Sequence, residues 1–222
     1  MGRFLRSRIR IAASGLSSFP FTGKRMEFEF GYDLKMEKGT VLVEADSGVV
    51  HTFFAMKIAE EAARKQQSLL YFTPRRKEEV LKDFRLFRIP DIPMLEVRSA
   101  GSGKDLPAEY QADLCIIEKF STLFAEAGTG DLMRALTVFS NATQARRIFI
   151  LVSDAGILPQ HLEKLLRASV DGVIQFLETA EGERIRRYIR IPKMPGFVTP
   201  DRMLPFTLTE EGIRIDPRER HR

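Results

Sequence analysis

Short apolar runs alternate with amphipathic segments along most of the chain. Residues 39–45 (GTVLVEA) form a β-branched run that predicts a buried strand, and residues 52–65 then carry apolar side chains at helical spacing. The alternation continues, with strands predicted at 68–74, 93–98, 113–118 and 146–154 and helices at 75–87, 131–145 and 159–169. Strands that alternate with helices indicate an α/β fold, in which a mostly parallel sheet is covered by helices on both faces.

The last quarter of the chain departs from this pattern, because strands follow one another without helices between them. Strand segments are predicted within 171–178, 184–192 and 204–217. Glu-Gly pairs at 181–182 and 211–212 mark the expected turns. We therefore expect the sheet to end in a C-terminal antiparallel extension.

The segment RIRRYIRIP, at 184–192, carries an unusual concentration of positive charge. Strand alternation places Arg184, Arg186, Tyr188 and Arg190 on one face. Guanidinium groups bind phosphate and an aromatic ring stacks on a base, so this face is a candidate nucleic-acid surface. A solvated face of an outer strand explains the same alternation, and both interpretations remain open.

Composition narrows the class of protein. The chain has 222 residues, of which 44% are hydrophobic, enough for one substantial core. Its one cysteine, Cys115, excludes an internal disulfide, and its place in the apolar run LCII predicts a packed small hydrophobe. No apolar run is long enough to cross a bilayer. We expect a cytoplasmic protein with one main domain.

Charge is concentrated at the start of the chain. Residues 1–25 contain six Lys and Arg and no acidic residue. They contribute +6, so the rest of the chain has a net charge of −1 and the whole chain has +5. We expect a basic arm at 1–25, a domain at 26–217 and a basic tail at 218–222. The arm fits a flexible tail, a segment that binds nucleic acid or a membrane surface, or a targeting segment, and the sequence leaves these open.

The turn after residues 39–45 stands where a nucleoside triphosphatase carries its phosphate-binding loop. That loop follows the pattern GxxxxGK[ST], because glycines let backbone N–H groups surround phosphate and the lysine supplies charge. The pattern, laid on residues 45–52, meets Ala45, Val50, His51 and Thr52, and only the threonine agrees. On this evidence alone, an ordinary strand–turn–helix connection explains the segment.

The chain nevertheless resembles the KaiC/RadA branch of the RecA-type ATPases from about residue 30 to residue 217. KGTVLVEADSGVVHTFFAMKIA is similar to the family's phosphate-binding segment, and DLCIIEKFSTLF is similar to its Walker B strand. The most specific similarity is the succession DGVIQF, RRYIRIPKMPG and LPFTLTEEGIRI, in the family's order and spacing. The resemblance implies a RecA-like fold.

The resemblance also implies which residues correspond to the family's site. Remnants of a nucleotide site would be Ser47, Gly48, His51, Thr52 and, at the Walker B position, Glu118, with ATP and Mg²⁺ as the ligands. Family members assemble as rings or filaments with nucleotide between subunits. Lys193 stands where they place a lysine that reaches the neighbour's nucleotide.

The departures from the family pattern lie at positions where the family carries its catalytic and phosphate-binding residues. Pro74 and Arg75 replace the pair of glutamates from which a water-activating base would come, and His51 replaces the phosphate-binding lysine. Val50 is β-branched where the backbone needs a glycine. We therefore predict no catalytic residue and no bound metal.

Three functions remain open on these grounds. The first is a pseudo-ATPase that regulates or scaffolds through protein contacts, as a homo-oligomer or with a protein partner. The second is a nucleic-acid-binding RadA-like paralogue in DNA repair or recombination. The third is a weak ATPase that uses the remnant residues.

Overall fold

A computed structural model describes residues 26–29, 33–46, 50–182, 184–196, 198–209 and 212–215. The predicted arm at 1–25, the tail at 218–222, and Ser47 and Gly48 lie outside these residues. The described chain begins with a two-stranded antiparallel hairpin formed by β1 (Met26–Glu29) and β2 (Asp33–Met36).

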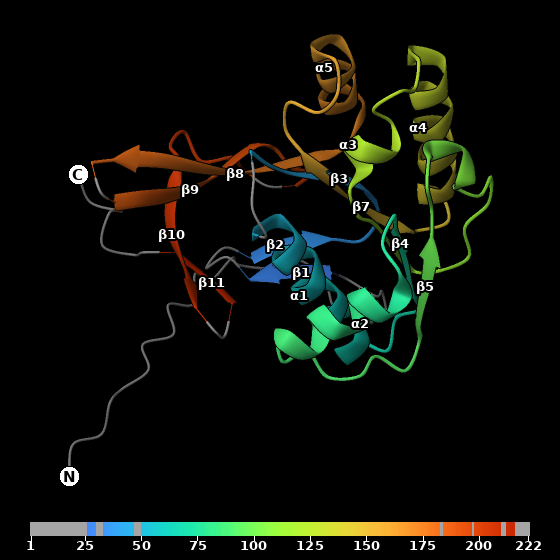
Figure 1. The fold of residues 1–222 in the computed structure, drawn as a ribbon, viewed down its shortest axis with the longest axis horizontal. Helices are drawn as coiled ribbons and strands as arrows, with labels where there is room; N and C mark the ends of the chain where they lie inside the picture. Colours follow the sequence, from blue (N-terminus) through green and yellow to red (C-terminus); the bar gives the residue numbers. More distant parts are fainter. Residues whose placement is uncertain are drawn as a thin grey trace, which may run out of the picture.

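A nine-stranded sheet forms the centre of the molecule, in the order β11-β10-β9-β8-β3-β7-β6-β4-β5 (Figure 1). Its parallel part comprises β3 (Gly39–Ala45), β4 (Leu69–Thr73), β5 (Leu95–Ser99), β6 (Leu114–Ile117), β7 (Ile148–Asp154) and β8 (Gly172–Glu181). The antiparallel part adds β9 (Arg184–Lys193), β10 (Leu204–Thr209) and β11 (Gly212–Ile215). The predicted fold class and the C-terminal antiparallel extension are confirmed.

Helices cover both faces of the parallel part. On one face lie α1 (Val50–Arg64) and α2 (Lys77–Leu86), and on the other lie α3 (Phe120–Leu123), α4 (Thr129–Thr143) and α5 (Gln160–Ser169) (Figure 1). Successive residues of a strand point to opposite faces, so Val41 and Val43 pack under α1 while Leu42 packs on the other side. Two apolar clusters result, separated by the sheet.

The boundaries of the predicted elements agree with the structure to within a few residues. The first helix begins at Val50, two residues before the expected start, and the next begins at Lys77 instead of residue 75. Glu79 accepts a hydrogen bond from the N–H of Arg76 and so helps to cap that second helix. Cys115 is fully buried in β6, as predicted, and burial raises the pKa of its thiol to about 12.

Three short elements were not predicted. They are the β1–β2 hairpin, helix α3 and a single 3₁₀ turn, η1 (Gly103–Asp105). Each strand or helix among them has four residues or fewer, which is too short to show a periodic pattern. The hairpin does carry a signal in hindsight, because Met26 and Phe28 alternate and pair with Met36 and Leu34.

The topology brings the ends of four strands to one edge. In a parallel sheet all carboxyl ends face the same way, so Ala45, Thr73, Ile117 and Asp154 end β3, β4, β6 and β7 side by side. Ligands of open α/β sheets bind outside this edge. The start of α1 follows β3 at the same edge, so His51 and Thr52 belong to it, as does Glu118 directly after β6.

Candidate functional site at the carboxyl edge of the sheet

His51 lies at the start of α1 and is fully buried. Its Nε2 is 3.1 Å from the Oδ1 atom of Asp154, the last residue of β7. The ammonium group of Lys119 donates to both oxygens of the same carboxylate, at 3.1 and 2.9 Å. We call these three residues the His51 cluster.

The His51 cluster is held in place by the backbone around it. Lys119 adopts a left-handed conformation, with φ of 55°, directly before α3. Such a backbone is uncommon outside glycine and is found where the surrounding structure imposes it. The N–H of Asp154 donates to Ser121 in α3, so both ends of the ion pair are fixed by the same short helix.

The surroundings keep the ring of His51 neutral. Burial lowers its pKa below the usual value of 6.5, and the nearby charge of Asp154 opposes this effect only in part because Lys119 acts in the other direction. The Nδ1 atom is buried and has no hydrogen-bond partner among the described residues. A proton added there would gain no acceptor among the described residues, so these surroundings favour the uncharged ring.

Glu118 follows β6 at the Walker B position and is 1% exposed. It accepts a hydrogen bond of 2.6 Å from the hydroxyl of Thr73. Arg75 donates to both of its oxygens, from Nε at 3.1 Å and from Nη2 at 2.8 Å. This is the bidentate geometry of a strong guanidinium–carboxylate pair.

Arg75 also reaches α2, where its Nη1 atom donates to Asp83 at 2.5 Å. Partial burial opposes the charged form, but the hydrogen bond to Asp83 and the charge of Glu118 together raise the pKa of Arg75 above its usual value. One permanently charged side chain therefore joins the ends of β4 and β6 to α2. We call Arg75, Glu118 and Asp83 the Arg75 cluster.

The described residues at this edge do not fit a magnesium–triphosphate group. Such a group needs free cationic donors for phosphate and a carboxylate that is free to bind the metal or its water. Here the donors of Lys119 and Arg75 are directed at carboxylates, and the carboxylate oxygens of Glu118 accept from Arg75 and Thr73. Among the described residues, no group of three or more His, Cys, Asp or Glu could hold a metal ion.

The structure brings only part of the predicted set together. Thr52 is 8% exposed on the first turn of α1, directly after His51, and Glu118 directly follows β6, two places from β3 in the sheet. Lys193 lies elsewhere, at the end of β9, where its ammonium group donates to the carbonyl oxygens of Arg167 and Ala168 at 3.3 and 3.1 Å. These carbonyls belong to the last turn of α5. The role of Lys193 across an interface stays a prediction.

The arginine-rich segment forms β9, as its alternation predicts. Arg184, Arg186 and Arg190 are exposed and Tyr188 is half-buried, while Ile189 is fully buried on the opposite face. The strand lies two or more places away from the carboxyl-edge residues in the sheet order, so it forms a separate surface.

Sequence reasoning missed the partners of these residues. Asp154 joins the His51 cluster, and the sequence does contain a signal for it, since a polar residue that ends a buried parallel strand lies at the ligand edge. The sequence drew attention to Arg75 only because, with Pro74, it replaces the family's pair of glutamates. Buried Glu44, which accepts from Arg167 at 2.8 Å and from Gln175 at 3.0 Å, has no signal in an otherwise apolar strand.

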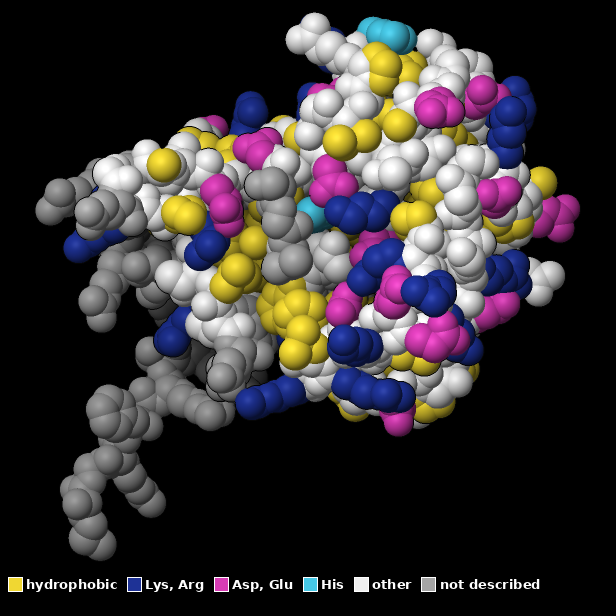
Figure 2. Space-filling model, in the orientation of Figure 1, with side chains coloured by type: hydrophobic (Ala, Val, Ile, Leu, Met, Phe, Trp, Pro, Cys, Tyr) yellow, Lys and Arg dark blue, Asp and Glu magenta, His cyan; other side chains and the backbone are white. Residues whose placement is uncertain are grey.

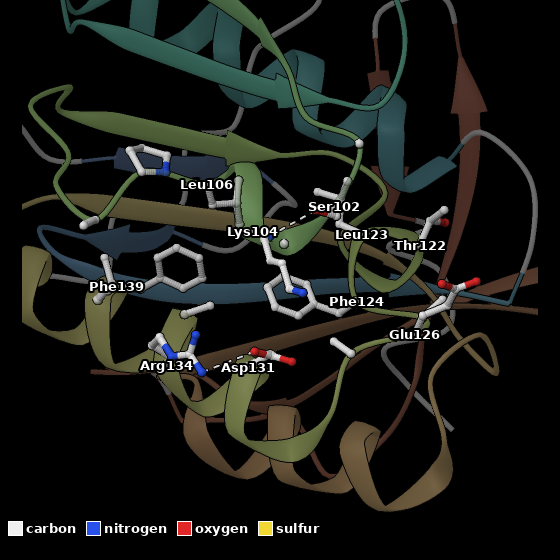
Figure 3. Close-up of a pocket in the computed structure, with 18 of the residues that line it drawn as sticks. Ser102, Lys104, Leu106, Thr122, Leu123, Phe124, Glu126, Asp131, Arg134 and Phe139 are labelled. Carbon is white, nitrogen blue, oxygen red and sulfur yellow. Dashed lines mark hydrogen bonds and ion pairs between the residues drawn. The ribbon is translucent and has the colours of Figure 1, made fainter.

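A cavity of about 730 Å³ lies on the α3–α4 side of the sheet (Figure 3). None of the predicted site residues lines it. Lys104 extends toward the ring of Phe124, and Arg134 pairs with Asp131. The N–H groups of Gly101 and Ser102 donate to Asp105, so the Gly-Ser-Gly-Lys segment beside the cavity is closed on its own carboxylate instead of forming a phosphate cradle.

The strand order, the parallel core covered by helices and the antiparallel C-terminal strands place the protein in the class of RecA-type P-loop ATPases. A model of the KaiC ATPase family matches residues 104–220, more than half of the chain, and the chain therefore belongs to the KaiC family of ATPases. No curated protein matches it in sequence.

Solved structures agree on the fold. The flagellar accessory protein FlaH from Methanocaldococcus jannaschii superposes with a TM-score of 0.70 at 17% identity, over 86% of this chain and 98% of FlaH. The KaiC-like protein PH0186 from Pyrococcus horikoshii OT3 superposes with a TM-score of 0.67 at 17% identity, over 83% of this chain and 92% of PH0186. Across the described residues, no helix is long and apolar enough to cross a membrane.

Proposed function

We propose that this chain is a pseudo-ATPase of the KaiC family, which does not hydrolyse ATP and acts through protein contacts as a regulator or scaffold. The observation that carries the proposal is the bidentate pair between Arg75 and Glu118 at the Walker B position. A carboxylate that would serve a metal ion is here paired with a fixed internal cation.

The energetics of that pair oppose nucleotide binding. Glu118 is buried, so a magnesium ion that needed its carboxylate would first have to separate it from Arg75. Breaking a buried pair costs about 3–5 kcal/mol, which corresponds to a loss of more than a hundredfold in affinity. The His51 cluster adds a second obstacle, since Lys119 would have to leave Asp154 before it could meet a phosphate.

Titration of the full chain with Mg–ATP tests the proposal. A ligand at 100 times its dissociation constant stabilises a protein by about 2.7 kcal/mol, which raises the melting temperature by several degrees. We expect no shift with 1 mM Mg–ATP or Mg–ADP and no release of phosphate. A magnesium-dependent shift together with phosphate release would favour the weak ATPase instead.

The variant Arg75→Ala distinguishes a nucleotide site that has been lost from one that Arg75 blocks. We expect the variant to remain unable to bind Mg–ATP, because the cationic lysine of the phosphate-binding loop is still missing. Arg76→Ala is the matched control, since Arg76 is an adjacent arginine that is mostly exposed and pairs only with Glu79 among the contacts described. If Arg75→Ala gains nucleotide binding and Arg76→Ala does not, Arg75 gates a working site and the proposal fails.

The scaffolding part has its own test. The tagged full-length protein is isolated from its own cells with Mg–ATP present or after nucleotide removal, and its mass is measured. We expect a complex of defined composition that is the same under both conditions. A free monomer under both conditions would contradict this part.

A further inference from the structure

We propose that the cavity beside η1 and α4 binds a small organic anion with an apolar body, whose charged group pairs with Lys104. Residues of the segments 101–108 and 122–127 and of α4 line this cavity, which has a volume of about 730 Å³. The inference goes beyond the proposed function and does not depend on it, because no residue of the His51 cluster or the Arg75 cluster lines the cavity.

The wall that carries Lys104 is held in place by its own contacts. Asp105 accepts hydrogen bonds from two backbone N–H groups of the preceding turn, at 2.8 Å each. The ring of Phe124 lies so close to Gly103 that a Cβ atom at this position would overlap it. Lys104 therefore extends from a backbone that is already ordered, which lowers the entropic cost of binding a ligand.

The lining contains one cation without a partner among the described residues. Four charged side chains line the cavity, and they are Lys104, Glu126, Asp131 and Arg134. Arg134 pairs with Asp131 at 3.3 Å, whereas no described group pairs with the ammonium of Lys104. Figure 3 shows Lys104 in the middle of the labelled residues and Glu126 at one end, away from it. An anion in the middle of the cavity would therefore meet Lys104.

The uncharged part of the lining favours an apolar body for the ligand. Partly exposed apolar side chains come from both walls, namely Leu106, Pro107, Ala135 and Val138. Small-molecule sites are mostly apolar, have a few polar groups and measure about 300–1,000 Å³, a range that includes this cavity. Burial of apolar ligand surface against these side chains would supply most of the affinity.

The wall also contains a hydrogen-bond donor that the described chain leaves unused. Tyr110 lines the cavity and is 3% exposed, and its hydroxyl has no partner among the described residues. Edge-to-face contacts with Phe139 and Phe149, at centroid distances of 5.8 and 4.9 Å, fix its ring. Burial raises the pKa of Tyr110, so the hydroxyl stays protonated. A buried donor without an acceptor costs free energy, which favours a ligand that brings acceptor oxygens.

A single small anion fits this arrangement better than a nucleic acid. A polyanion is held by several cations in a row, whereas one of the two cations here is paired with Asp131. On the face that Figure 2 shows, Lys and Arg side chains are interspersed with Asp and Glu over much of the helical part and do not gather into one broad basic surface. The charge at the cavity is therefore local.

Titration of the full chain with anilinonaphthalene sulfonate (ANS), an aromatic anion that fluoresces in apolar surroundings, tests the proposal. We expect saturable binding by the wild type. Ala135→Phe should weaken this binding by about tenfold or more, because the added ring occupies space that the probe needs. Thr137→Phe is the matched control, since it adds the same ring at an exposed position of α4 that does not line the cavity, and it should bind like the wild type.

The role of Lys104 is tested with two probes that differ in charge. Phenylnaphthylamine has the rings of ANS and lacks the sulfonate. Lys104→Met should weaken the binding of ANS by about 2- to 5-fold, the effect of an exposed ion pair, and leave that of phenylnaphthylamine unchanged. Lys164→Met removes an exposed lysine of α5 and should change neither affinity.

Circular dichroism checks that each variant is folded, and the exposed position of Lys104 keeps the test decisive if Ala135→Phe is not. The proposal is overturned if the wild type shows no saturable binding of ANS, if folded Ala135→Phe binds it equally well, or if Lys104→Met weakens both probes alike. Sedimentation examines a different occupant. A wild-type dimer that Ala135→Phe dissociates would mean that a second copy of the chain covers the cavity, and this result would also overturn the proposal.

Discussion

At the scale of single residues, the neutral ring of His51 is the clearest case of an environment that decides chemistry. An isolated histidine is partly charged near pH 7. This one is buried, bonds to Asp154 through one nitrogen, and has no described partner for the other. Since Lys119 already neutralises Asp154, the carboxylate does not need a second cation. His51 therefore acts as a structural link between α1 and β7.

A pH titration of stability tests this assignment. Because the folded-state pKa of His51 is lowered, the unfolded chain binds a proton that the folded chain does not as pH falls through about 6.5. The stabilising effect of the neutral ring is complete above that pH. It is lost below it at up to about 1.4 kcal/mol per pH unit.

We expect the free energy of unfolding in urea to decline more steeply between pH 7.5 and 5.5 for the wild type than for His51→Gln. The glutamine keeps a donor for Asp154 and cannot titrate, so all other groups contribute equally to both curves. Parallel curves would show that His51 does not carry the effect.

At the scale of elements, the end of α5 shows a cap supplied from another part of the chain. The last carbonyls of a helix have no partner within it and carry partial negative charge. Lys193, on β9, donates to two of these carbonyls, those of Arg167 and Ala168. The contact joins the antiparallel extension to a helix of the parallel part. Lys193 therefore has partners within its own chain, independently of any contact with a neighbouring subunit.

Lys193→Met removes this cap and keeps the length of the side chain. We expect a loss of about 1 kcal/mol in the free energy of unfolding, the usual effect of a cation at a helix C-terminus. Lys164→Met, on the exposed side of α5, should stay within about 0.5 kcal/mol of the wild type.

Both variants are measured at two protein concentrations that differ twentyfold. An internal cap gives the same loss at both concentrations. A loss that appears only at the higher concentration would mean that Lys193 acts between subunits, as the family resemblance implies.

At the scale of the whole molecule, the sheet has a dense centre and a lightly attached edge. Every residue of β3 is buried, and β7 is buried except for its last residue. The edge is joined to the rest of the sheet through β9 and β10, for which the described residues show two paired positions, Leu204 with Ile189 and Pro205 with Tyr188. Local opening starts where few pairs and contacts must break.

Hydrogen exchange should follow this gradient. We expect the amides of β3 and β7 to exchange only through global unfolding, and those of β10 and β11 to exchange faster through local opening. Exchange monitored by mass spectrometry under native conditions gives the comparison. Equal protection of all four strands would contradict the gradient.

The sequence by itself determined the order and type of the long elements, because their signals are local. A β-branched run such as GTVLVEA and the helical spacing after it can be recognised without knowing what they touch. The family resemblance also predicted a degenerate phosphate-binding turn and the loss of the two glutamates. Short elements such as α3 were missed, because four residues contain no repeat.

Only the tertiary structure decided what the polar residues at the carboxyl edge do. His51 and Asp154 are 103 residues apart in the chain, and Arg75 and Glu118 are 43 apart. An ion pair depends on distance and burial, and neither is written in the order of the residues. The sequence predicts that the family's nucleotide-binding groups are missing, and the fold shows that His51 pairs with Asp154 and Arg75 pairs with Glu118.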